Sequence, residues 1–237
     1  MAITIGDEQK GFRREALTPH FMEAGEEKVT ASGALRTDGH FVHHEGELDD
    51  ERHTSTWFDA DALFRDTSVV NHVIPAMVHK LPLEVLCSID VVVAVATGGV
   101  GLALQTCAYI DTERPREMEA LSCLFLRHAG KEDYGFSNGD KLWIADWTEA
   151  HKHKPRCLVL DDVFYFGTTT TNVVEYLRTD DVKVIVTAIL HAAGTNQTRP
   201  KLLNRIPQGC FFDFDPGPAY QRRDCPMCKA GMPKTIV

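Results

Sequence analysis

The interpretation of the whole chain starts from the stretch Cys157-Leu-Val-Leu-Asp161-Asp162-Val-Phe-Tyr-Phe-Gly167-Thr-Thr-Thr-Thr171. Its apolar beginning is typical of a buried parallel strand. Two adjacent carboxylates follow, and then a glycine and four threonines. In the next residues, Val173, Val174 and Leu177 fall on one face of a helix. This order predicts a phosphate site, because the backbone N–H groups and the dipole of a helix N-terminus attract an anion.

A simpler interpretation is a buried strand followed by a threonine-capped helix. It accounts for one aspartate and one threonine, but it leaves a second carboxylate beside a hydroxyl-rich turn unexplained. That combination suits a ligand that carries both a diol and a phosphate.

Composition sets the broad class of the protein. The chain has 237 residues, of which 43% are hydrophobic and 25% are charged. This is the composition of an ordinary globular protein, and the length fits one substantial α/β domain. The net charge of −9 argues against a general nucleic-acid or anionic-membrane binder. We also expect no signal peptide and no membrane span, because the sequence has no basic start followed by an apolar core and no sufficiently long apolar run.

Seven cysteines are scattered along the chain. Four of them, Cys87, Cys107, Cys123 and Cys157, lie in apolar segments, where a reduced thiol behaves as a small core residue. An odd count without a secretion signal predicts a reducing, cytoplasmic location.

Apolar runs alternate with helical patterns over most of the chain. Strands are predicted near 90–96, 121–127, 157–161 and 182–190, and residues 90–96 are the richest of these in β-branched residues. The fold class is therefore α/β, with a central parallel sheet flanked by helices and joined by right-handed connections. The expected domain is single and spans 1–237, with a core at about 55–194 and a small hood from 1–54 and the tail 195–237. Residues 1 to about 54 are expected to be polar and irregular.

A glycine-rich turn follows the first of these strands. Residues 97–101 read Thr-Gly-Gly-Val-Gly, and a helix is expected from Leu102. The spacing breaks the dinucleotide fingerprint, since the sixth position counted from Gly99 is Leu104, and no Gly-Lys-Ser/Thr follows as in a P-loop. Two interpretations remain, namely a tight turn without a ligand and a turn whose N–H groups hold pyrophosphate.

The stretch that begins at Cys157 resembles the phosphoribosyl-diphosphate motif of the type I phosphoribosyltransferases, and the chain as a whole is most similar to the orotate enzymes. Asp161, Asp162, Gly167, Thr168 and Thr169 match this motif. Tyr165 and Phe166 stand where the family has small polar residues.

The resemblance implies a Mg²⁺-dependent transfer of a phosphoribosyl group from phosphoribosyl diphosphate to a nitrogenous base, with orotate or another pyrimidine as the expected acceptor, in a homodimer. The acidic pair would engage the ribose, with Mg²⁺ bound nearby through the substrate. The 5′-phosphate would lie on the turn and helix start that contain Gly167, Thr168, Thr169, Thr170 and Thr171. Pyrophosphate would bind at Thr97, Gly98 and Gly99.

Three further residues take roles from the resemblance. Arg127 and Lys131 look like the cations of the family's catalytic loop, although His128, Ala129 and Asp133 depart from its signature. Arg36, in Leu35–His40, is similar to a substrate-contacting residue of the hood.

Two departures bear on specificity and on catalysis. Residues 191–194 lack the arginine that helps the orotate enzymes to hold orotate, and Tyr165 replaces the aspartate of many purine enzymes. A second hypothesis is therefore a catalytically silent regulator that kept the fold and binds phosphoribosyl diphosphate or a nucleotide.

The tail contains a single Cys-x-x-Cys at Cys225 and Cys228. A zinc site there would need about four ligands, with Cys210 and a histidine to complete it. The loose group His40, His43, His44 and His53 fits no metal-site spacing and is interpreted as a solvated loop. A protein built only around zinc would leave the three anion-loop motifs unexplained.

Overall fold

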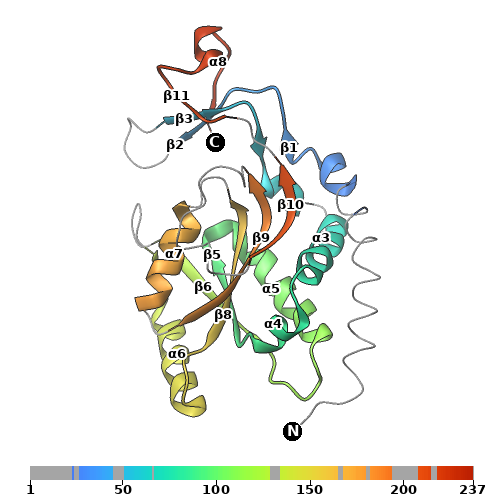
Figure 1. Cartoon of the computed structure of the whole chain (residues 1–237), viewed down its shortest axis with the longest axis vertical. Coiled ribbons are helices and arrows are strands. Elements are labelled where there is room, and N and C mark those ends of the chain that lie inside the picture. Colours follow the sequence, from blue (N-terminus) through green and yellow to red (C-terminus); the bar gives the residue numbers. More distant parts are fainter. Residues whose placement is uncertain are drawn as a thin grey trace.

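The computed structural model describes residues 23, 27–44, 51–65, 67–128, 134–164, 168–179, 182–193, 208–214 and 218–236, and a six-stranded sheet lies at its centre (Figure 1). The order of the strands is β10-β9-β8-β5-β6-β7. All neighbours in the sheet are parallel except β6 and β7. The strands are β5 (Val91–Val95), β6 (Ser122–His128), β7 (Tyr134–Gly135), β8 (Arg156–Phe164), β9 (Lys183–Ala193) and β10 (Gln208–Phe214). The predicted α/β class with a parallel central sheet is confirmed.

The strand order creates a switch point between β5 and β8. Among the five parallel strands, the first in the chain, β5, lies between the second, β6, and the third, β8. Connections therefore run outward in both directions from the β5–β8 pair. Ligands of open α/β sheets bind beyond the carboxyl ends of the strands at such a point.

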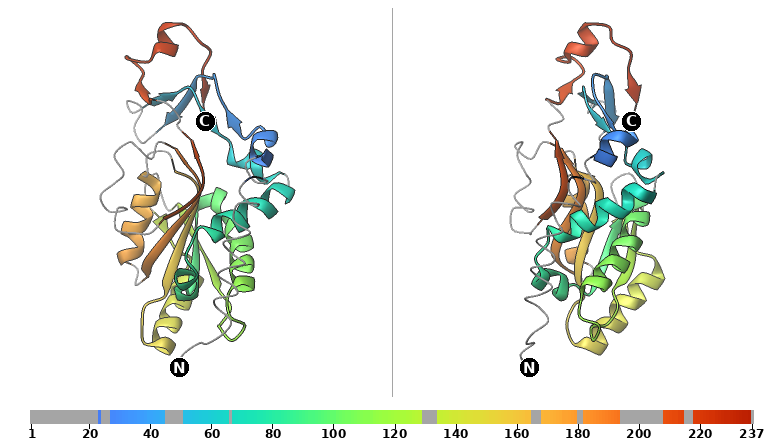
Figure 2. Two further views of the ribbon diagram at one scale, coloured as in Figure 1. Left: turned by 45° about the vertical axis from the view of Figure 1, so that its right-hand side comes forward. Right: turned by 90° about the vertical axis from the view of Figure 1, so that its right-hand side faces the viewer.

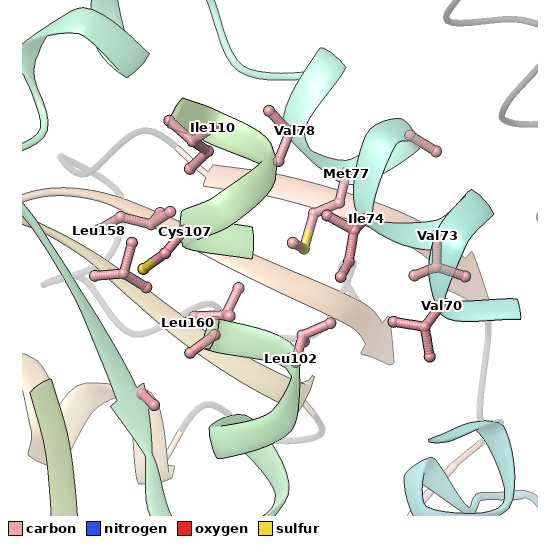
Figure 3. Close-up of a cluster of buried hydrophobic side chains, with 14 of the residues drawn as sticks. Val70, Val73, Ile74, Met77, Val78, Leu102, Cys107, Ile110, Leu158 and Leu160 are labelled. Atoms are coloured by element: carbon pink, nitrogen blue, oxygen red, sulfur yellow. The ribbon is translucent and has the colours of Figure 1, made fainter. Parts of the chain in front are cut away.

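Helices cover both faces of the sheet (Figure 2). On one face, α5 packs on β8, and α3 packs on α5 and on β9 and β10; Figure 3 shows Met77, Leu102 and Leu160 within this buried layer. On the other face, Ile144 of α6 and Leu177 of α7 join a second buried cluster. The helices are α2 (Ala60–Phe64), α3 (Thr67–His79), α4 (Leu83–Ser88), α5 (Ala96–Glu113), α6 (Asn138–His151) and α7 (Thr168–Thr179).

Several elements differ from the sequence expectation. Helix α5 begins at Ala96 directly after β5, so the predicted glycine turn is the first turn of a helix. Residues 142–147 lie inside α6, which Ser137 starts with a capping box. Strand β8 continues past the acidic pair to Phe164. Strand β10 was not predicted, although it completes the central sheet.

A four-stranded sheet combines the two ends of the chain, in the order β11-β3-β2-β12. Its strands are β2 (Phe41–His44), β3 (Glu51–Thr54), β11 (Tyr220–Gln221) and β12 (Thr235–Ile236), and the short helix α8 (Pro226–Lys229) follows β11. Figure 1 shows this unit, here called the hood, beyond the carboxyl ends of β9 and β10. The expectation of an irregular segment up to residue 54 was therefore wrong for 41–44 and 51–54.

A two-stranded pair, β1 (Leu35–Arg36) with β4 (Trp57–Phe58), connects the hood to the core. Among the described residues, no helix is long and apolar enough to span a membrane.

Candidate active site

The acidic pair lies where β8 separates from β5. The last paired residues of these strands are Ala94 and Leu160, whereas β8 stays paired with β9 through Asp161 and as far as Phe164. Asp161 and Asp162 therefore lie just beyond the carboxyl end of the β5–β8 pairing. At these two residues β8 is still paired with β9 but no longer with β5. This is the position at which the strand order predicts a ligand.

Asp161 is buried and faces helix α7. Its side chain is 5% exposed, and its Oδ2 accepts a hydrogen bond from the Thr170 hydroxyl at 3.2 Å. Its Oδ1 accepts the backbone N–H of Asp162 at 3.0 Å. Burial, together with the neighbouring Asp162 carboxylate, raises the pKa of Asp161 well above its ordinary value. Asp162 is half-buried, and strand alternation directs it to the opposite face, which α5 covers.

Helix α7 begins with four threonines, Thr168–Thr171. The first N–H groups of a helix have no partner within the helix, so this turn presents donors at the edge that carries the acidic pair. Thr170 is buried against Asp161, whereas Thr169 is exposed. Tyr165, Phe166 and Gly167 lie outside the described residues.

The second predicted anion site is the first turn of α5, which contains Thr97, Gly98 and Gly99. A Cβ at Gly99 would lie 3.2 Å from the carbonyl oxygen of Leu160, so a glycine lets α5 approach β8 one residue before the acidic pair. The helix N-terminus is thus held beside Asp161 and Asp162. The dinucleotide and P-loop interpretations stay excluded, and the packing role explains Gly99.

Tyr134 of β7 is a residue that the sequence analysis missed. It is 9% exposed, and burial raises the pKa of its phenol, with a further contribution from the negative charge of Asp161. A hydrogen bond with the Thr169 side chain opposes this shift. Tyr134 therefore joins the start of α7 to the end of β6, where Arg127 is paired with Gly135.

Of the three cationic residues predicted for the site, Arg127 and Arg36 are among the described residues. Arg127 is exposed near the end of β6, at the same edge of the sheet as the acidic pair, while Lys131 lies outside the described residues. Arg36 of β1 forms an ion pair with Asp59 at 3.2 Å, and Asp59 also caps α2. Arg36 is 51% exposed, so this contact leaves much of its guanidinium accessible.

A second group of polar residues lies in the hood. His40 and His53 are 2% and 0% exposed, and they meet Cys225 and Cys228. One potential ligand atom from each residue lies within 4.8 Å of all the others. The interpretation of these two histidines as part of a solvated loop was wrong, and the partners of the cysteine pair are two histidines. The side chains of His43, His44 and Cys210 are outside the description.

Solved structures that are similar to this one include orotate phosphoribosyltransferases and adenine phosphoribosyltransferases. Orotate phosphoribosyltransferase from Aeropyrum pernix has a TM-score of 0.55 and 18% identity, with 80% of this chain and 93% of that one covered. Adenine phosphoribosyltransferase from Rhodothermus marinus has a TM-score of 0.55 and 16% identity, with coverages of 81% and 99%. Orotate phosphoribosyltransferase from Mycobacterium tuberculosis, solved with inorganic phosphate, has a TM-score of 0.51 and 13% identity, with coverages of 82% and 96%.

The chain has the type I phosphoribosyltransferase fold. No family model matches the sequence, and no curated protein does. Because the identities are below 20% for these three structures, the likeness concerns the phosphoribosyltransferase fold itself and leaves the reaction to be argued from the residues.

Proposed function

We propose that this protein is a Mg²⁺-dependent phosphoribosyltransferase that acts on phosphoribosyl diphosphate and a nitrogenous base. The bond between C1′ of the ribose and pyrophosphate breaks, a bond from C1′ to a ring nitrogen of the base forms, and pyrophosphate leaves with the bonding electrons. One observation carries the proposal, namely an acidic pair at the β5–β8 switch point, directly beside the threonine-rich start of α7.

Each part of the site suits one part of the substrate. The first turn of α7 offers N–H groups and hydroxyls to the 5′-phosphate, and the first turn of α5 offers N–H groups to pyrophosphate. Asp161 and Asp162 accept hydrogen bonds from the ribose hydroxyls. They also offset the positive charge that develops on the ribose as pyrophosphate departs. The negative charge of Asp162 disfavours ionisation of Asp161, because the two carboxylates repel each other. A bound cation or a developing positive charge removes this repulsion and favours the state in which both are ionised.

The leaving group accumulates negative charge, and Arg127 and Lys131 are the residues proposed to stabilise it. Mg²⁺ prefers oxygen ligands, so the Asp161 and Asp162 carboxylates would hold it near the substrate, directly or through water. The bound ion would neutralise part of the pyrophosphate charge. Tyr134 lies beside Thr169, next to the proposed phosphate site.

The proposed acceptor is orotate or another pyrimidine. Tyr165, in place of the aspartate of many purine enzymes, favours a pyrimidine, and Arg36 in the segment before the hood is the proposed base-side contact. Orotate enzymes and adenine enzymes match the fold equally well, so the preference rests on these residues. We further propose a homodimer in the cytoplasm; the buried thiols Cys107 and Cys157 carry no disulfide, as expected for a reducing compartment.

The test is pyrophosphate release. Purified protein is incubated with Mg²⁺, phosphoribosyl diphosphate and a panel of pyrimidine and purine bases. We expect release with a pyrimidine, loss of release when Mg²⁺ is chelated, and loss of most activity in Asp162→Asn. Asp146→Asn is the matched control, since Asp146 is exposed on α6. Release that is equal in Asp162→Asn and wild type would show that the site is misplaced.

A non-catalytic regulator is the second candidate, motivated by Tyr165, Phe166 and the altered segment after Arg127. It predicts binding of phosphoribosyl diphosphate without pyrophosphate release for every base in the panel. The same assay, combined with a binding measurement, therefore separates the two functions.

A further inference from the structure

We propose that His40, His53, Cys225 and Cys228 bind one Zn²⁺ in a closed tetrahedral site that fastens the C-terminal segment to the hood. The ligand atoms are His40 Nε2, His53 Nδ1 and the two cysteine sulfurs, all within 4.8 Å of one another. Cys228 Sγ is 3.6 Å from His40 Nε2 and 3.4 Å from His53 Nδ1, and Cys225 Sγ is 3.7 Å from His40 Nε2.

These distances fit a zinc tetrahedron. With Zn–S near 2.3 Å and Zn–N near 2.05 Å, a sulfur and a nitrogen ligand stand about 3.6 Å apart. All three S···N distances lie within about 0.2 Å of that value. The two imidazole nitrogens are 2.7 Å apart, and an ion between them requires a separation of about 3.3 Å. Of the four distances given above, the one between the two nitrogens needs the largest adjustment, about 0.6 Å.

The surroundings orient each histidine for this task. His40 Nδ1 is 3.0 Å from the carbonyl oxygen of Met232, which fixes the tautomer that leaves Nε2 as a ligand. His53 Nε2 is 3.4 Å from a carboxylate oxygen of Glu51, which leaves Nδ1 as a ligand. Metal-bound histidines almost always donate their second N–H to such an oxygen. When both outer N–H groups donate in this way, the two facing nitrogens both carry lone pairs, which a metal ion can accept.

The cysteines are arranged as in a metal-binding turn. Cys225 caps α8, and its Sγ accepts the backbone N–H of Cys228 at 3.4 Å. Such a bond stabilises negative charge on sulfur, which is the form that binds a metal. Two thiolates and two imidazoles favour Zn²⁺ over Mg²⁺ or Ca²⁺, and four protein ligands leave no open position for substrate. The site is thus structural.

Two of the four strands of the hood are very short. Strands β11 and β12 have two residues each, and the exposed Ile236 contributes little apolar burial. A sheet with such short strands is weak unless it is fastened. The ligands lie 13 and 3 residues apart within each pair, but the two pairs are separated by 172 residues or more, counted from His53 to Cys225. One ion therefore links two distant segments above the edge of the sheet that carries the acidic pair (Figure 1).

Zinc content and Co²⁺ absorption test this proposal without reference to activity. Untagged full-length protein is purified without chelators and analysed for metals, and the zinc is then replaced by Co²⁺. We expect about one zinc per chain, together with intense tetrahedral Co²⁺ bands and thiolate charge-transfer bands. Cys228→Ser and His53→Ala lose the metal, whereas His53→Cys retains it. Cys123→Ser and His151→Ala, outside the cluster, are the matched controls.

Two results would overturn the proposal. One is wild-type protein that contains no zinc, takes up none from Zn²⁺ buffer, and carries a Cys225–Cys228 disulfide in mass spectrometry. The other is zinc that stays at one per chain in both Cys228→Ser and His53→Ala. If these variants fail to fold, hydrogen exchange on chelated wild-type protein decides the question, because loss of the ion must selectively increase exchange in β2, β3 and α8.

Discussion

The hydrogen bond between Thr170 and Asp161 gives the sharpest energetic prediction. In Thr170→Val the shape is kept, but the donor to Asp161 Oδ2 is lost at a site where the two side chains are 1% and 5% exposed. A neutral hydrogen bond contributes about 1 kcal/mol to stability, and one to a charged group about 1.5–3 kcal/mol. We therefore expect a loss of about 1 kcal/mol while Asp161 is protonated and about 2–3 kcal/mol when it is ionised.

The sign of the pH dependence follows from linkage. Burial and the Asp162 carboxylate raise the pKa of Asp161 in the folded state above its unfolded value of about 4. The contribution of protonated Asp161 to the free energy of unfolding is therefore complete below about pH 4, and it is lost as the pH rises through the folded-state pKa. Thr170 limits this loss, because its hydrogen bond lowers the pKa. Removing the hydroxyl raises that pKa further, so the penalty of the substitution must grow with pH.

Urea denaturation of wild type and Thr170→Val between pH 4.5 and 8.5 measures this difference. Thr106→Val is the matched control, since Thr106 is 0% exposed and its hydroxyl has no hydrogen-bond partner among the described residues. The control is expected to be neutral or up to about 1 kcal/mol more stable. A penalty for Thr170→Val that is constant across this range, or equal to that of Thr106→Val, would refute the reasoning.

Two further predictions concern the sheet. Asp90 pairs with Arg156 through two contacts of 2.8 Å, so Asp90→Asn is expected to cost about 1–2 kcal/mol near pH 7, discounted for the partly exposed arginine. Burial alone would raise the pKa of Asp90, but the hydrogen bonds from Arg156 outweigh it and lower this pKa. The cost of the substitution is therefore present above about pH 4 and disappears as the pH falls through the lowered pKa. A cost that is unchanged at pH 2.5 would contradict the pairing. Leu160→Ala removes a fully buried side chain between α5 and the sheet and should cost about 2–5 kcal/mol in thermal or urea unfolding, whereas Leu104→Ala, at a side chain 52% exposed, should cost less than about 0.5 kcal/mol.

The strands of the central sheet were largely predictable because their signal is local. Val91–Val95 is an unbroken apolar run of strand-forming residues, and each of its residues is buried. A strand that shows no alternation must be covered on both faces, which already implies a parallel sheet with helices on each side. The acidic pair was predictable for the same reason, since it interrupts such a run.

The start of α5 at Ala96 was not predicted, because the helix propensity of this segment and its packing in the fold favour different structures. Glycines at 98, 99 and 101 disfavour a helix by about 1 kcal/mol each, so the sequence alone favours a turn. The close approach of Gly99 to the Leu160 carbonyl requires a residue without a side chain inside the helix. Strand β10 was missed because its signal is a short run, flanked by Pro207 and Pro216, that pairs only with β9.

The hood could not be derived from the chain in order. His40 and His53 fit no metal-binding spacing, and Cys225-Pro-Met-Cys228 supplies only half a ligand set. Their meeting depends on β11 and β12 adding to the sheet of β2 and β3, which is a long-range event without a local signature. Tyr134 was missed similarly, because its relation to Thr169 and Asp161 exists only in the fold.

Binding of phosphoribosyl diphosphate tests most directly whether the β5–β8 switch point is the functional site. Isothermal titration with and without Mg²⁺ is performed on wild type, Asp146→Asn and the double variant Asp161→Asn/Asp162→Asn, with circular dichroism to verify folding. We predict one site per chain in wild type and Asp146→Asn, and at least about tenfold weaker binding in the folded double variant, corresponding to about 1.4 kcal/mol. Equal affinity in all three proteins, or no binding to wild type, would contradict the account.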